Sequence, residues 1–94
     1  MPYEIRYSNE AVEQLKKLRD FDRTAILDQI EEILSANPTV TSKSRIKRLW
    51  EPAPTQYRLR VGEFRVFYDM EEEAVLIIQV LSKQDSNDYL GGSL

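Results

Sequence analysis

The 94-residue chain contains no cysteine and no histidine. The absence of cysteine excludes a disulfide framework and a thiol nucleophile, and it favours a reducing cytosol. The absence of histidine removes the commonest general base and metal ligand, which excludes a Ser-His-Asp triad and a zinc site. Any catalysis must therefore use Arg, Lys, Tyr, Asp or Glu, and we expect neither a metal nor a cofactor.

A long hydrophobic run is also missing. The longest one, AVLIIQVL at residues 74–81, is interrupted by Gln79 and is far too short to cross a bilayer. The first ten residues, MPYEIRYSNE, lack the apolar core of a signal peptide. We therefore expect one cytoplasmic domain, residues 1–94, that has no association with a membrane.

Positive charge is scarce overall but concentrated in one part of the sequence. The net charge is −3, yet residues 43–65 hold only two acidic residues, Glu51 and Glu63. The same segment holds seven basic residues: Lys43, Arg45, Lys47, Arg48, Arg58, Arg60 and Arg65. An acidic protein with such a basic segment is typical of one anion-binding patch rather than of a uniformly cationic surface.

The pattern of apolar residues predicts an α+β fold. A strand over residues 2–7 precedes an amphipathic helix over 9–19, and a second helix is capped by Asp22 and closed by Asn37-Pro38. Further strands are predicted at residues 45–50, 56–61, 64–69 and 74–82. We expect an antiparallel hairpin of two helices on one face of a three- to four-stranded antiparallel sheet, whose other face is partly open.

The segment YRLRVGEFRVFY, residues 57–68, has the pattern of a β-hairpin with a two-residue turn at Gly62-Glu63. Glycine at the first turn position suits a type II′ turn, whose twist matches that of the flanking strands. Counting outward from this turn gives the pairs Val61–Phe64, Arg60–Arg65, Leu59–Val66, Arg58–Phe67 and Tyr57–Tyr68. Because side chains alternate, the apolar residues share a core face, and the other face carries Arg58, Arg60, Arg65 and Phe67.

Three arginines on one face repel one another. The directly opposed pair, Arg60 and Arg65, costs up to ~1 kcal/mol when nothing compensates it. A merely solvated face is one explanation, because long arginine side chains can lie over apolar surface with their heads in water. The clustering favours a second explanation, a phosphate cradle in which guanidinium groups bind phosphate oxygens and Phe67 stacks on an RNA base.

Several features together resemble the RelE/ParE superfamily of toxins from bacterial toxin–antitoxin pairs. They are the order of elements, the YRLRVGEFRVFY hairpin, the acidic turn DMEEE, the strand VLIIQVLS, and a basic residue followed by a late tyrosine. The resemblance covers nearly the whole chain, and YRLRxGxxRVxY is its most specific part. It implies a microbial RNase-like fold and a tight complex with a cognate antitoxin. In the RelE branch, which the residues favour, it implies metal-free cleavage of mRNA in the ribosomal A site.

The resemblance to the RelE branch also implies a catalytic set at five positions: Arg58, Arg60, Arg65, Lys83 and Tyr89. The first two positions are usually lysine and the fourth is usually arginine, so this chain departs from the pattern at three places. The tail is also more acidic than usual, because Asp85 and Asp88 lie between Lys83 and Tyr89.

The implied reaction is attack of a ribose 2′-hydroxyl on the neighbouring phosphate, which leaves a 2′,3′-cyclic phosphate and a free 5′-hydroxyl. Arginine neutralises the charge of the transition state but is not deprotonated in proteins, so Arg58 and Arg60 cannot be the base. Lysine can act as a base only if its neighbours lower its pKa. Lys83 or Tyr89 must then transfer protons, with Asp85 and Asp88 as alternative bases, unless the ribosome and the RNA supply part of this chemistry.

Other residues are open to two interpretations. Four basic residues either extend the cradle toward ribosomal RNA or are simply solvated: Lys43, Arg45, Lys47 and Arg48. Trp50 either stacks on a base or anchors the core, and the second is commoner for a tryptophan beside a strand. The carboxylates of DMEEE are interpreted as a solvated turn rather than as a metal site.

The favoured function is a ribosome-dependent mRNA endoribonuclease, whose partners are a cognate antitoxin, the ribosome and mRNA. One alternative is a ParE-like inhibitor that binds DNA gyrase without catalysis, which the acidic net charge and the arginine substitutions favour. Another is a degenerate member that only binds its antitoxin. All three predict an antitoxin that clasps the helix hairpin or the sheet edge and masks the arginines.

Overall fold

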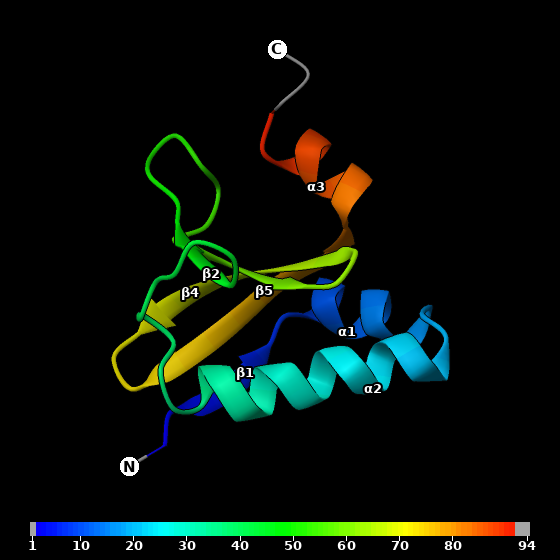
Figure 1. Ribbon diagram of the computed structural model, residues 1–94, viewed down its shortest axis with the longest axis horizontal. Helices are drawn as coiled ribbons and strands as arrows, with labels where there is room; N and C mark the ends of the chain where they lie inside the picture. The colour runs from blue at the N-terminus through cyan, green and yellow to red at the C-terminus, as the bar shows by residue number, and fades with distance from the viewer. Residues whose placement is uncertain (1, 92–94) are drawn as a thin grey trace.

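A computed structural model describes residues 2–91, so Met1 and residues 92–94 of the predicted domain lie outside the described residues. The elements in chain order are β1 (Glu4–Tyr7), α1 (Asn9–Lys16), α2 (Asp20–Gln29), the π-helical turn η1 (Ile30–Leu34), β2 (Ile46–Arg48), β3 (Tyr57–Val61), β4 (Phe64–Glu71), β5 (Ala74–Ser82) and α3 (Lys83–Tyr89). The helices α1 and α2 cover one face of the sheet, and α3 lies over the other (Figure 1).

The sheet has five strands in the order β1-β5-β4-β3-β2. The pair β1–β5 is parallel, with Glu4 opposite Ala74, whereas the other pairs are antiparallel. The predicted α+β fold with an N-terminal strand and two helices is confirmed, but the predicted three- to four-stranded antiparallel sheet is wrong. The sheet is mixed because β1 enters it beside the last strand, and local patterns do not reveal such a long-range pairing.

Both long helices begin close to the predicted positions. In α1 the N–H of Ala11 donates to the Oγ of Ser8 over 3.0 Å, so Ser8 is the N-cap of this helix. The helix α2 begins at Asp20, two residues before the predicted cap. Asp20 and Asp22 both lie in its first turn, where acidic side chains favour the positive end of the helix dipole. The π-helical turn then extends the apolar stripe to the fully buried Leu34.

The core lies between α1, α2 and the sheet. It includes Ala11 and Leu15 of α1, Ile26 of α2, Ile30 and Leu34 of η1, and Ile46, Tyr57, Leu59, Val66, Tyr68, Val75, Ile77 and Val80 of the strands. The buried hydroxyl of Tyr68 donates to the carbonyl oxygen of Pro38 over 2.7 Å, which ties the loop after η1 to the sheet. Among the helices of residues 2–91, none is long and apolar enough to span a membrane.

The β3–β4 hairpin has the predicted register at all five pairs, from Val61–Phe64 to Tyr57–Tyr68. Gly62 has a φ of 57° and Glu63 does not share this positive value, as a type II′ turn requires. The predicted division of the hairpin into an apolar face and an arginine-bearing face is therefore confirmed.

The short helix α3 was not predicted. Its N-cap is Ser82, whose Oγ accepts from the N–H of Asp85 over 3.1 Å. The buried Ser86 donates its hydroxyl to the carbonyl oxygen of Lys83 over 2.7 Å. The sequence KQDSNDY has no apolar periodicity, so only the N-cap serine signals a helix there. This helix decides where Lys83 and Tyr89 lie.

Candidate functional site

The arginine face is the side of β2, β3 and β4 that points away from α1 and α2. Its residues are Lys47, Arg58, Arg60, Arg65, Phe67 and Asp69. In cross-strand order Lys47 lies opposite Arg58, which lies opposite Phe67, and in the row nearer the turn Arg60 lies opposite Arg65. Alternation along three neighbouring strands thus gathers four cations on one surface: Lys47, Arg58, Arg60 and Arg65.

Within the described part of the chain, the guanidinium groups of this face have no carboxylate partners. Among residues 2–91, no ion pair involves Arg58, Arg60 or Arg65. The Nε of Arg58 is buried and makes no hydrogen bond within the described part of the chain. Burial, followed by the charges of Arg65 and Arg60, lowers the pKa of Arg58. Burial and mutual repulsion thus raise the free energy of the charged guanidinium groups in the folded protein, and a bound anion would lower it.

Arg65 has a structural role as well. Its side chain is only 7% exposed, and its Nη1 donates to the carbonyl oxygens of Gly62 and Phe64, each over 2.9 Å. Burial and the charge of Arg60 lower the pKa of Arg65. This guanidinium therefore fastens the hairpin turn, whereas the exposed Arg60 remains open to solvent.

The helix α3 brings the two remaining residues of the predicted catalytic set to this face. The backbone N–H of Lys83 donates to the carbonyl oxygen of Glu63 over 2.8 Å, and its side chain is exposed. At the other end of α3, the ring of Tyr89 meets the ring of Phe67 edge to face, with centroids 4.9 Å apart. All five predicted catalytic residues thus lie on or beside one side of the sheet.

Burial raises the pKa of the Tyr89 phenol, and the nearby carboxylates of Asp69 and Glu10 raise it further. A raised pKa keeps the phenol protonated at neutral pH. Tyr89 is therefore suited to donate a proton rather than to accept one.

Two aromatic side chains lie where sequence reasoning did not expect them. Phe67 is fully buried beneath Tyr89, so its ring cannot stack on a base in this conformation. The alternation placed Phe67 on the correct face, but it could not reveal the helix that covers it. Trp50, expected in the core, is 72% exposed.

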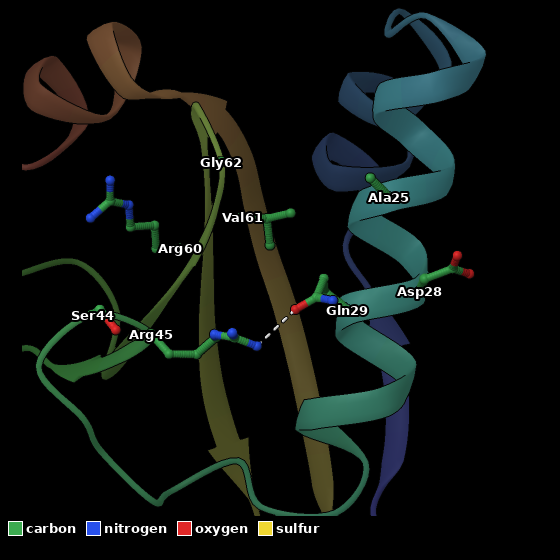
Figure 2. Close-up of a pocket in the computed structure, with 8 residues that line it drawn as sticks. All are labelled: Ala25, Asp28, Gln29, Ser44, Arg45, Arg60, Val61 and Gly62. Atoms are coloured by element: carbon green, nitrogen blue, oxygen red, sulfur yellow. Dashed lines mark hydrogen bonds between the residues drawn. The ribbon is translucent and has the colours of Figure 1, made fainter.

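The four basic residues proposed to extend the cradle do not gather there. Only Lys47 lies on the arginine face, and Lys43 is exposed in the loop before β2. The guanidinium of Arg45 reaches toward α2 and donates from Nη1 to Oε1 of Gln29 over 3.0 Å (Figure 2). Arg48 packs between two aromatic rings at the edge of the sheet.

Figure 2 also shows that Arg60 points away from α2, although its base lines the same pocket as Arg45. This pocket of about 450 Å³ is lined by Ala25, Asp28, Gln29, Ser44, Arg45, Arg60, Val61 and Gly62. It lies between α2 and the hairpin turn, and among its lining residues Arg60 also belongs to the arginine face.

Sequence reasoning missed Asp69, a carboxylate on the arginine face. Its Oδ1 accepts the N–H of Gln56 over 2.8 Å, which ties the start of β3 to β4. The same alternation that identified Arg65 and Phe67 would have placed Asp69 two residues further along the same face. Among residues 2–91, no cluster of His, Cys, Asp and Glu side chains has the grouping needed to hold a metal ion.

Comparison with known proteins identifies the family. The model of the family described as the ParE toxin of type II toxin–antitoxin system, parDE, matches residues 5–86. No curated protein sequence matches the chain significantly. The chain belongs to this ParE toxin family, which confirms the prediction of a RelE/ParE superfamily toxin from a type II toxin–antitoxin pair.

Solved structures support the same fold. A chain of the RelBE2 toxin–antitoxin complex from Mycobacterium tuberculosis is 24% identical with a TM-score of 0.72, over 87% of this chain and 99% of that chain. A chain of the RelB-RelE complex from Methanococcus jannaschii is 25% identical with a TM-score of 0.68, over 89% and 96%. A mutant of the Escherichia coli toxin RelE in the free state is 19% identical with a TM-score of 0.70, over 100% and 99%.

Proposed function

We propose that this toxin cleaves mRNA on the ribosome. The observation that supports the proposal best is the arginine face, where Arg58, Arg60 and Arg65 share one surface and form no ion pair with any carboxylate of residues 2–91. Such a surface is suited to a phosphodiester, because guanidinium groups bind phosphate oxygens in a bidentate manner. Lys83 and Tyr89 flank it on α3 and can supply the proton transfers that cleavage requires.

The proposed reaction proceeds by attack within the RNA strand. The ribose 2′-oxygen forms a bond to the adjacent phosphorus while the bond from phosphorus to the 5′-oxygen of the next nucleotide breaks. Arg58 and Arg60 neutralise the charge that develops on the phosphoryl oxygens. Tyr89, which is held protonated, gives its proton to the leaving 5′-oxygen.

The proton of the 2′-hydroxyl needs a separate acceptor. The arginines remain charged and the Tyr89 phenol remains protonated, so within the catalytic set only Lys83 can take this role. It can do so only as the neutral amine, because the ammonium form has no lone pair to accept a proton. Lys83 and Tyr89 are about 9 Å apart along the axis of α3. We place the scissile phosphate over the arginines, between these two residues.

We also infer a cognate antitoxin that covers the arginine face. Several structures of similar fold are complexes of a toxin with its antitoxin, including RelB-RelE from Pyrococcus horikoshii. An antitoxin that supplies carboxylates to Arg58 and Arg60 would neutralise their charge and block RNA at the same time.

The test is induction of the toxin without its antitoxin, followed by mapping of mRNA 5′ ends on translating ribosomes. We expect cuts in phase with codons that leave a free 5′-hydroxyl. The matched control is Arg60→Ala, because Arg60 is exposed and its loss leaves the core intact. Intact mRNA in cells whose growth is arrested by the wild-type toxin would contradict the proposal.

A second candidate function is non-enzymatic inhibition of DNA gyrase. The specific observation in its favour is that the matching family model is described as the ParE toxin rather than as RelE. It predicts intact mRNA, loss of gyrase supercoiling activity, and toxicity that survives substitution of Tyr89 by Phe. The same induction experiment therefore separates the two candidates.

A further inference from the structure

Trp50 is the only tryptophan of the chain, and 72% of its surface is exposed. It lies in the loop between β2 and β3, two residues beyond the end of β2. A side chain of this size is seldom left so open, because burying its surface would stabilise the fold. Its position therefore calls for an explanation.

A stack of side chains holds Trp50 in place from one side. The guanidinium carbon of Arg48 lies 4.4 Å from the centre of the Trp50 ring and 5.1 Å from the centre of the Tyr57 ring. Tyr57 stacks in turn on Tyr68, with centroids 5.5 Å apart and planes 13° from parallel. Nη1 of Arg48 also contacts the hydroxyl of Tyr57 over 3.3 Å. The exposed indole is thus the outer end of a stack that begins in the core.

Polar groups surround the open side of this stack. A pocket of about 650 Å³ is lined by Arg48, Leu49, Trp50, Glu51, Ala53, Pro54, Thr55, Gln56 and Asp69. Asp69 and Gln56 each keep hydrogen-bonding capacity, because Asp69 uses Oδ1 for the N–H of Gln56 and Gln56 uses Oε1 for the N–H of Met70. A carboxylate oxygen and an amide NH₂ therefore remain to meet a polar ligand.

This pocket adjoins the arginine face. Asp69 belongs to both, and Trp50 is three residues from Lys47, which lies directly opposite Arg58. Three residues of extended chain span at most about 11 Å. Because Asp69 borders both the pocket and the arginine face, a polyanion that extends from Arg58 toward Asp69 reaches the edge of the pocket that contains Trp50.

We propose that Trp50 is a stacking platform for an unpaired RNA base that flanks the phosphate held on the arginine face. This inference rests on the proposed action on RNA. The free face of the indole stacks on the base, and Asp69 and Gln56 meet its polar edge, with Asp69 accepting from an amino group. The fixed stack beneath Trp50 reduces the side-chain freedom that is lost on binding.

The surroundings of Trp50 fit a base better than a protein partner. The centre of a protein interface is depleted in charged residues, whereas this pocket contains Arg48, Glu51 and Asp69. The carboxylates repel a phosphate placed directly over them. They therefore favour a base at Trp50 and leave the phosphates to Lys47 and the arginine face.

The single tryptophan makes a direct test possible. The full-length toxin is titrated with a 2′-O-methyl oligoribonucleotide, which cannot be cleaved because its attacking oxygen is blocked. Emission of Trp50 reports stacking, and anisotropy of a label on the RNA reports total binding. We expect quenching at saturation, and we expect Trp50→Ala to weaken RNA binding about 5- to 150-fold. Trp50→Phe, which keeps a ring, should retain most of the affinity.

Two further variants serve as controls. Phe21→Ala removes another exposed aromatic side chain, 81% exposed at the start of α2, and should leave RNA binding unchanged. Arg58→Ala should lower the dependence of binding on salt by about one phosphate contact, whereas Trp50→Ala should leave that dependence unchanged because stacking releases no counterions.

The outcomes separate this inference from the proposed function. Unquenched emission at saturating RNA, or wild-type affinity in Trp50→Ala, would overturn the stacking platform while Arg58-dependent binding upheld action on RNA. An absence of RNA binding by the wild-type toxin would overturn the platform, whereas the proposed function on the ribosome is decided by the mapping of mRNA 5′ ends. If Trp50→Ala lost toxicity in cells but kept full RNA affinity, Trp50 would belong to a protein-binding surface and the platform would be wrong.

Discussion

The two faces of the β3–β4 hairpin are made from alternate residues of the same strands, yet they differ in almost every physical respect. On the core face Leu59, Val66 and Tyr68 are fully buried under α1, α2 and the loop that follows η1. On the arginine face Arg58 is half-buried, and its Nε has no hydrogen-bond partner within the described residues. Arg60 on the same face is exposed. The core face buries its side chains against the rest of the chain, whereas on the arginine face Arg58 and Arg60 form no ion pair within residues 2–91.

Adjacent residues of one strand therefore have different roles: those on the core face stabilise the fold, and those on the arginine face are available to bind a ligand. Burial of apolar side chains favours folding, whereas the clustered cations oppose it slightly until an anion arrives. Two residues lie between these extremes. Arg65 binds the carbonyl oxygens of the turn, and Phe67 is buried by Tyr89, so the arginine face contributes to stability at these two points.

The largest expected effect comes from removing a single oxygen atom beside the arginine face. Tyr89→Phe keeps the ring that packs on Phe67, so its stability should equal that of the wild type. The phenol proton is lost, and we expect the rate of RNA cleavage on the ribosome to fall about 10²- to 10⁴-fold. Single-turnover cleavage with purified ribosomes measures this rate. An unchanged rate would remove Tyr89 from the proposed mechanism.

The next effect compares two neighbours on β3. Leu59→Ala opens a cavity in the core and should lower the free energy of unfolding by about 2–5 kcal/mol. Arg58→Ala removes a desolvated cation repelled by Arg65 and Arg60, so it should not destabilise the fold, although it should reduce RNA binding. Urea denaturation of both variants measures the difference. Equal losses of stability would show that the two faces are not separable.

Arg65→Ala should give a smaller, mixed effect. The variant loses two hydrogen bonds from a charged group to the turn, which should lower the free energy of unfolding by about 1–3 kcal/mol. Relief of repulsion with Arg60 offsets part of this loss. Arg60→Ala is the matched control, because it relieves the same repulsion without touching the turn. If both variants had the same free energy of unfolding, the hydrogen bonds of Arg65 to the turn would not contribute to stability.

The hairpin was predictable because its information is local. A glycine that requires a positive φ fixes the turn, and the turn fixes every pair outward to Tyr57 and Tyr68. The parallel pairing of β1 with β5 was not predictable, because 66 residues separate the last residue of β1 from the first of β5 and the apolar pattern of β1 fits either direction. The register of a hairpin follows from the residues of its own turn, whereas the order of strands in the sheet depends on residues far apart in the sequence.

The sequence allowed us to predict which residues form the candidate site, but not that α3 would cover part of it. Alternation placed Arg58, Arg60 and Arg65 together, yet it gave no sign that α3 would bury Phe67. That helix has a polar sequence, and it is held mainly by its Ser82 cap and by the contact of Tyr89 with Phe67. Trp50 was expected in the core because most tryptophans are largely buried. Here the guanidinium of Arg48 packs on its ring, and the rest of the side chain is exposed in the loop between β2 and β3.

The smallest expected effect tests the core face by placing a charge on it. Burial raises the pKa of Tyr7 to about 12, and the charge of Glu31 adds to this rise. Because the folded protein disfavours the ionised phenol, the contribution of Tyr7 to stability is complete below pH ~10 and is lost as the pH rises toward 12. Tyr68 and Tyr89 also have raised pKa values and act in the same direction. Thermal melts from pH 8 to 12 should therefore show falling stability above pH 10, and Tyr7→Phe should reduce the slope without abolishing it. An identical slope in the variant would show that Tyr7 ionises as freely in the folded chain as in the unfolded one.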